Sequence, residues 1–99
     1  MEMIVQTKYV DTVKEVLSVL EGPFGAQPIM GSIVYNERTN RVNLFTVGQD
    51  LDGEDFYEKP IVIALTDEGK ISIEKNDTDL DIRKELVKRG VSEEDIIQK

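Results

Sequence analysis

The sequence predicts an α+β domain with the element order α-β-β-β-β-α: an N-terminal helix, a four-stranded antiparallel meander, and a C-terminal helix with a short final turn. Apolar residues recur with the helical period of about 3.6 residues at both ends of the chain, and with a period of two between them. Short turns join the alternating segments, which favours antiparallel neighbours. Because only the two helices can cover the sheet, we expect both to pack on one face of it.

The first helix is predicted from Lys8 to Glu21. Its apolar residues fall at positions i, i+4, i+7, i+8 and i+11, and this spacing places them on one helical face. Gly22 and Pro23 follow. We expect the helix to end there, because Gly tolerates a left-handed cap and Pro cannot continue the turn. The apolar face consists of Tyr9, Val13, Val16, Leu17 and Leu20.

The middle of the chain predicts four strands separated by polar or acidic turns. In the second strand Val42, Leu44 and Thr46 point to one face, and the residues between and after them point to the other. Pro60 lies within the third strand, where it requires an edge or a bulge position because it lacks a backbone N–H. The predicted strands are Ile29–Asn36, Arg41–Gly48, Phe56–Thr66 and Lys70–Lys75, and the turns are Glu37–Asn40, Asp50–Asp55 and Asp67–Gly69.

The last part of the chain returns to helical periodicity. Thr78 is the predicted N-cap, because a Thr hydroxyl can accept from a free backbone N–H of the first helical turn. Gly90 is the predicted C-terminal cap, and Ser92 is expected to start the short final turn. The buried stripe of this helix consists of Ile82, Leu86 and Val87.

Length and charge narrow the possible partners. The 99 residues suit one domain spanning residues 1–99, because two halves would each be too short to bury a useful core. The 20 acidic residues outnumber the 12 basic ones and there is no His, so the net charge is −8. This charge repels phosphate backbones and anionic membranes and attracts a basic protein partner. The alternative interpretation is that the charge only keeps the protein soluble.

The absence of both Cys and His from the sequence excludes several kinds of chemistry. Disulfides, thiolate nucleophiles, Cys- or His-based metal sites and His-activated serines all require these residues. We therefore expect no cofactor, no metal and no catalytic centre, and we predict a protein that acts by contacting another macromolecule. Met1–Ile4 lacks the features of a signal peptide, and no apolar run approaches the roughly 20 residues that span a bilayer, so a cytoplasmic location is expected.

The acidic stretches do not fit a calcium-binding loop, which requires Gly at its sixth position and Glu at its twelfth. In Asp50–Asp55 the glycine, Gly53, is fourth, and Ile61 stands at the twelfth position. The alternating aspartates from Asp77 to Asp81 lack both residues as well. The first stretch is therefore interpreted as a solvated hairpin loop and the second as helix capping.

Aromatic side chains and the acidic loop supply the candidate partner-binding residues, because aromatics dominate interface energetics and carboxylates attract a basic partner. Phe45 and Phe56 are interpreted as core residues. Tyr35 and Tyr57 can be either core residues or interface residues. The basic cluster Arg83, Lys84, Lys88 and Arg89 can touch phosphate, but the helix dipole accounts for it without a ligand. The candidate partner-binding residues are Tyr35, Tyr57, Asp50, Asp52, Glu54 and Asp55.

Several short motifs between Ile33 and Gln98 stand in the order found in one family of small proteins. They begin with a hairpin that joins Val34–Arg38 to Leu44–Asp50. By these motifs the sequence resembles the XisI family of fdxN-element excision controlling factors. The further motifs are Glu68–Glu74, Thr78–Asp79, Ile82, Glu85–Val87, Gly90–Val91 and Glu94–Ile97.

The resemblance implies a regulatory accessory protein linked to site-specific DNA excision in cyanobacteria. It also implies a frequent partner, the nuclease-like protein XisH, and it supplies no catalytic residue. This sequence departs from the family pattern at Gln49 and Ser72, where the family often has Trp. The tail that the family has after the final Ile is absent from this sequence, which ends at Lys99.

These observations lead to one principal hypothesis, a non-enzymatic protein of the XisI type. It would bind a basic, nuclease-like partner through its acidic rim and the uncovered sheet face, since carboxylates can occupy sites built for phosphate. Three alternatives remain. One is a homo-oligomer, above all a homodimer, formed through edge strands. The others are a small enzyme that uses carboxylates and direct DNA binding through residues 83–89.

Overall fold

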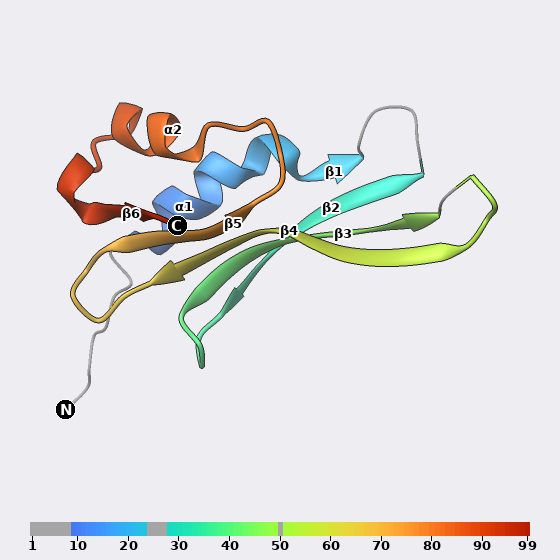
Figure 1. The fold of residues 1–99 in the computed structure, drawn as a ribbon, viewed down its shortest axis with the longest axis horizontal. Helices are drawn as coiled ribbons and strands as arrows, with labels where there is room; N and C mark the ends of the chain where they lie inside the picture. The colour runs from blue at the N-terminus through green and yellow to red at the C-terminus, as the bar shows by residue number, and fades with distance from the viewer. Residues whose placement is uncertain (1–8, 24–27, 50) are drawn as a thin grey trace.

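Two helices lie on one face of a six-stranded sheet in the computed structural model, which describes residues 9–23, 28–49 and 51–99 (Figure 1). The strands follow one another across the sheet in chain order, and all neighbours are antiparallel except β5 and β6. The elements are α1 (Val10–Leu17), the 3₁₀ turn η1 (Ser18–Leu20), β1 (Gly22–Pro23), β2 (Ile29–Asn36), β3 (Arg41–Gln49), β4 (Asp55–Leu65), β5 (Ile71–Asn76), α2 (Ile82–Lys88), the 3₁₀ turn η2 (Glu93–Asp95) and β6 (Ile96–Gln98).

The sheet corrects the expectation of a four-stranded antiparallel meander. Strands β2 to β5 form that meander, but β1 adds to one edge and β6 adds to the other, so the sheet of the described residues has six strands and is mixed. These two strands are two and three residues long, too short for any alternation to show in the sequence. The parallel pairing of β6 is possible because α2 and η2 lie in the connection from β5 and give it the length of a crossover.

Helix α1 packs its apolar face against the sheet, as its spacing predicts. Val13, Val16 and Leu17 are buried. The regular helix ends at Leu17 and continues as a 3₁₀ turn, so it is shorter than predicted, and the predicted start at Lys8 lies outside the described residues. At this change the Ser18 hydroxyl donates to the Glu15 carbonyl oxygen at 2.6 Å, a local bond by which Ser competes with regular helical geometry.

Helix α2 is capped by Asp81 and not by the predicted Thr78. The Asp81 carboxylate accepts from the backbone N–H of Lys84 at 3.1 Å. Thr78 instead belongs to the preceding turn, where its hydroxyl donates to the side-chain oxygen of Asn76 at 2.6 Å. Gly90 adopts φ +95° beyond the helix end, which confirms the predicted glycine cap.

The hydrophobic core fills the space between the helices and one face of the sheet. Leu44, Ile61 and Ile63 lie at its centre and are fully buried. The phenol of Tyr9 donates to the carboxylate of Asp95 at 2.9 Å, which connects the residue before α1 to η2 at the far end of the chain. The remaining core residues are Val10, Val13, Val16, Leu17, Val42, Leu65, Ile71, Ile73, Ile82, Leu86, Val91 and Ile96.

Pro60 lies in a bulge of the central strand β4, one of the two positions that the sequence allowed for it. Leu44 of β3 pairs with Ile61, but Thr46 pairs with Glu58, so two residues of β4 face a single residue of β3. A bulge leaves its extra residue outside the ladder of hydrogen bonds, and a Pro without an N–H is tolerated there.

Because only one face of the sheet is buried, we expect truncation of a side chain to lower the free energy of unfolding more on that face than on the other. We expect Ile63→Ala to lower the free energy of unfolding by about 2–5 kcal/mol, because it leaves a cavity in the core. Val34→Ala, on the other face and 44% exposed, should cost less than about 1 kcal/mol. Urea unfolding followed by circular dichroism measures both values, and equal costs would contradict a core confined to one face.

Candidate functional site

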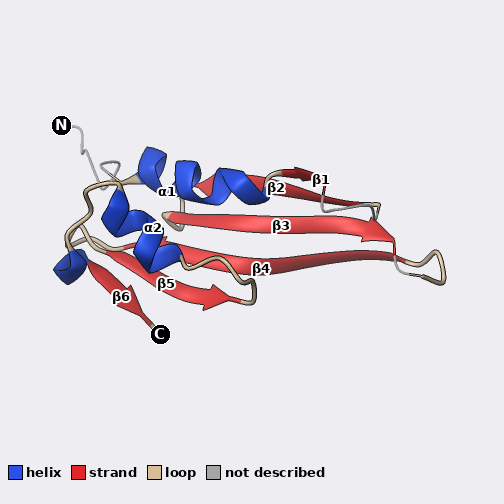
Figure 2. Ribbon diagram, turned by 90° about the horizontal axis from the view of Figure 1, so that it is seen from above, coloured by secondary structure: helices blue, strands red, loops and turns tan. Residues whose placement is uncertain are grey.

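The acidic loop, residues 51–55, lies at the tip of the β3–β4 hairpin. The hairpin extends well beyond both helices, so the loop projects from the body of the molecule (Figure 2). Asp52, Glu54 and Asp55 are exposed there, whereas Asp50 lies outside the described residues. The Gln49 side-chain amide donates to the Asp55 carboxylate at 3.2 Å across the two strands. A projecting group of exposed carboxylates can steer a basic partner at low ionic strength.

Tyr57 connects the acidic loop to the sheet face that lies away from the helices. Its ring stacks on Phe45 of the neighbouring strand, with centroids 5.2 Å apart and planes inclined by 15°. Tyr57 is 65% exposed. The core position expected for Phe45 is not observed: this residue is half-buried, on the side of the sheet opposite the core. Aromatic rings in such a pair offer a large apolar contact area to a partner.

The structure does not bring Tyr35 together with the other candidate residues. Tyr35 pairs with Val42, whose side chain is in the core, so it lies on the helix-covered face at the opposite end of the sheet. Its hydroxyl donates to the Asn40 side-chain oxygen at 2.9 Å, and the Lys14 ammonium lies 5.9 Å from its ring centroid. These contacts give Tyr35 a structural role where β2, β3 and α1 meet.

The sheet face away from the helices, called the open face here, is covered by neither described helix (Figure 1). Eight large apolar side chains of the described residues are exposed, and five of them belong to this face. Strand alternation indicates that such a face exists, but the register of the strands is needed to assemble it. The five are Met30, Val34, Val47, Tyr57 and Ile97.

A charged cluster borders the open face beside β6, and it was not expected from the sequence. The Ser72 hydroxyl donates to Glu74 at 3.0 Å, while Lys99 and Arg41 approach the same carboxylate at 3.4 and 3.6 Å. The hydrogen bond from Ser72 and, after it, the positive charges of Lys99 and Arg41 hold the pKa of Glu74 below its usual value of 4.5. Glu74 is therefore ionised at neutral pH and forms ion pairs with both Lys99 and Arg41.

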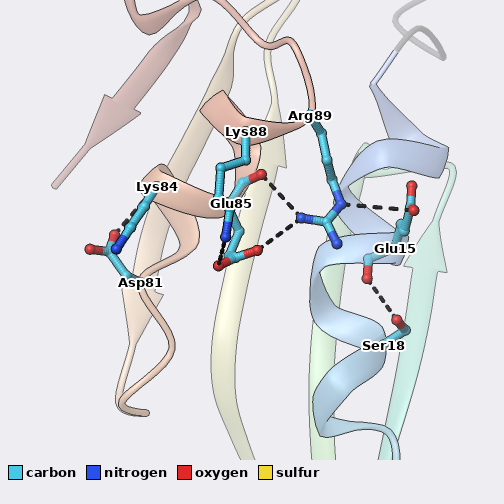
Figure 3. Close-up of polar contacts among 7 residues, drawn as sticks. All are labelled: Glu15, Ser18, Asp81, Lys84, Glu85, Lys88 and Arg89. Atoms are coloured by element: carbon cyan, nitrogen blue, oxygen red, sulfur yellow. Dashed lines mark hydrogen bonds and ion pairs between the residues drawn. The ribbon is translucent and has the colours of Figure 1, made fainter.

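The basic cluster of the C-terminal helix is largely occupied by ion pairs (Figure 3). Arg89 donates to the Glu85 carboxylate at 2.9 Å and lies 3.8 Å from Glu15 of α1, and Lys88 lies 3.6 Å from Glu85. The hydrogen bond from Arg89 lowers the pKa of Glu85, with a further contribution from Lys88. These pairings fasten α2 to α1 and leave the cluster poorly suited to a phosphate.

The described residues were compared with the arrangements that a metal ion and a membrane-spanning helix require. No group of three or more His, Cys, Asp or Glu residues there is arranged to hold a metal ion. None of the helices in the described ranges is long and apolar enough to cross a bilayer.

Comparison with known proteins identifies the relatives of this fold. A family model described as XisI protein matches residues 1–98. The chain is similar to a XisI-like protein from Anabaena variabilis ATCC 29413, with 27% identity and a TM-score of 0.76 over 93% of this chain and 84% of that chain. It is also similar in fold to the fdxN element excision controlling factor XisI from the same organism, with 18% identity and a TM-score of 0.62 over 93% and 79% of the two chains. No curated protein matches the chain.

The lowered pKa of Glu74 predicts a pH-dependent contribution to stability. Because the pKa is lower in the folded state, the carboxylate stabilises the fold fully above its usual pKa and loses this effect as the pH falls through the folded value. We expect Glu74→Gln to cost about 0.5–1 kcal/mol at pH 7, the range of partly exposed ion pairs, and almost nothing near pH 2. Urea unfolding at the two pH values measures the difference. Glu37→Gln in an exposed turn serves as the control, and an equal cost for Glu74→Gln at both pH values would refute the assignment.

Proposed function

We propose that this chain, which belongs to the XisI protein family, is a regulatory protein that controls excision of a DNA element by binding a protein partner. The match of the family model over residues 1–98 carries the proposal. The fold similarity to an fdxN element excision controlling factor supports it. We further propose that the chain acts in the cytoplasm.

The proposed role is regulatory and not catalytic. The sequence has no His to serve as a general base near neutral pH and no Cys to serve as a nucleophile. Among the described residues, the carboxylates with shifted pKa values are Glu74 and Glu85, and both pKa values are lowered. The hydrogen bond from Ser72 is the largest cause for Glu74, and the hydrogen bond from Arg89 is the largest cause for Glu85. A carboxyl group that acts as a general acid needs a raised pKa, so these two groups do not suit that role.

The proposed partner is a basic, nuclease-like protein of the XisH type, and the acidic loop is its proposed contact. A protein that cleaves or holds DNA presents cations for phosphate oxygens, and a carboxylate can accept the same hydrogen bonds. Asp52, Glu54 and Asp55 are exposed. The loop that joins β3 to β4 extends beyond both helices (Figure 2), so the body of the molecule does not obstruct a protein that approaches it. Net charge of −8 would accelerate the encounter with such a partner.

The proposal predicts that the acidic loop governs binding of an XisH-type protein. In a variant carrying Asp52→Asn, Glu54→Gln and Asp55→Asn, we expect the dissociation constant at about 50 mM salt to rise by about tenfold or more, because the partner's cations lose their carboxylates. The difference should shrink as salt screens the exposed charges. Titration calorimetry at low and at high salt measures both effects.

A matched control removes three exposed carboxylates elsewhere, through Glu37→Gln, Glu68→Gln and Glu94→Gln. The control has the same net charge as the loop variant, so it should keep most of the affinity if the loop is the contact. Equal weakening in both variants would leave net charge as the only cause and refute the loop as the contact. No binding by the unaltered chain would refute the partner itself.

A further inference from the structure

The open face has an unusual residue at its centre, Asn43 of β3. On this face Asn43 stands between Val34 of β2 and Val62 of β4, with which it is paired in the sheet. Its side-chain oxygen is buried and has no hydrogen-bond partner among the described residues. A buried carbonyl oxygen without a donor costs free energy, so native structures rarely retain one without a reason. An amide in the middle of an apolar face therefore suggests a donor that comes from another molecule.

A second copy of this chain supplies the matching donor. A primary amide both donates and accepts, so two Asn43 side chains related by a twofold axis can each donate from Nδ2 to the Oδ1 of the other. Stacked sheets lie about 10 Å apart, a distance that two facing Asn side chains and a hydrogen bond of about 2.9 Å can span. The last torsion of Asn is broad, so rotation about it can turn the covered oxygen toward the partner.

The charge of the open face also suits self-association. An acidic chain repels its own copies wherever its carboxylates predominate. The open face and its border instead balance the cations Arg41, Lys75 and Lys99 with the carboxylates Glu74, Asp55 and Asp77, of which Asp77 lies 3.6 Å from Lys75. Two copies that meet through this face keep their acidic surfaces apart.

The size of the open face is of the order that a stable interface needs. Strands β2 to β5 contain 8, 9, 11 and 6 residues. With a rise of about 3.3 Å per residue and about 4.8 Å between strands, the face measures roughly 26 Å by roughly 19 Å, on the order of 500 Å² in projection. A standard interface buries about 800 Å² on each partner. The edge strands β1 and β6, by contrast, have only two and three residues with which to pair another chain.

We propose that two copies of this chain form a homodimer by stacking their open faces, with the twofold axis passing between the two Asn43 side chains. The apolar side chains around Asn43 provide the buried area, and the reciprocal amide pair fixes the register of the two sheets, as a single buried Asn does in coiled coils. The dimer does not depend on the partner proposed above, because Asn43 and its paired neighbours Val34 and Val62 lie outside the acidic loop. Only Asp55 belongs both to that loop and to the open face.

Sedimentation velocity of the full chain between about 1 and about 200 μM tests the proposal. We expect the unaltered chain to sediment as a dimer. Asn43→Asp should weaken the dimer by about a hundredfold or more, because it places two like charges against each other at the axis. Asn36→Asp is the matched control. It adds the same charge at the edge of the same face, where the side chain caps a turn by accepting from the N–H groups of Arg38 and Thr39, and it should leave the dimer intact.

A second pair of variants keeps the test decisive if Asn43→Asp fails to fold. Val34→Lys adds a cation beside Asn43 and should abolish the dimer, whereas Val19→Lys, at an exposed valine of η1 away from the open face, should not. Circular dichroism verifies the fold of each variant. A monomeric wild-type chain at every concentration would overturn the proposal, as would a dimer that survives both Asn43→Asp and Val34→Lys. Equal loss of the dimer in Asn43→Asp and Asn36→Asp would overturn the amide pair. Binding of a different protein to the open face of a monomeric chain would show that this protein, and not a second copy, occupies the face.

Discussion

Burial of a single face of the sheet under two short helices is the constraint on which the rest of this structure depends. Leu44, Ile61 and Ile63 are fully buried beneath α1 and α2. These helices have only eight and seven residues, so among the described elements they cover one face and leave the other to solvent. Five of the eight large apolar side chains that are exposed among the described residues therefore lie on the uncovered face, where another molecule can bury them.

The charges divide the surface into two regions with different chemistry. The acidic loop lies at the tip of the β3–β4 hairpin, and its described carboxylates are exposed to solvent. The open face has apolar side chains and is bordered by cations gathered around Glu74, whose lowered pKa keeps it ionised. The first region suits rapid, salt-sensitive recognition and the second suits a buried contact.

Membership of the XisI family leaves room for differences at the surface. The Ser72 side chain is buried, and its hydroxyl donates to Glu74. Ser72 pairs with Ala64 on the sheet side opposite the helices, outside the main core, so the fold does not require a large side chain there. The position therefore alters the chemistry of the open face and not the packing that defines the fold.

The sequence by itself determined the elements whose periodicity is visible over several residues. The first predicted strand has the bounds of β2, Pro60 occupies a bulge, and the alternation of Val42, Leu44 and Thr46 identifies the buried face. Tertiary structure decided the pairing of segments far apart in the chain. It added β1 and β6, whose two and three residues have no period, and it set the register that places Asn43 between Val34 and Val62. Local patterns record which residues are apolar, but only contacts between distant strands decide which of those residues become neighbours.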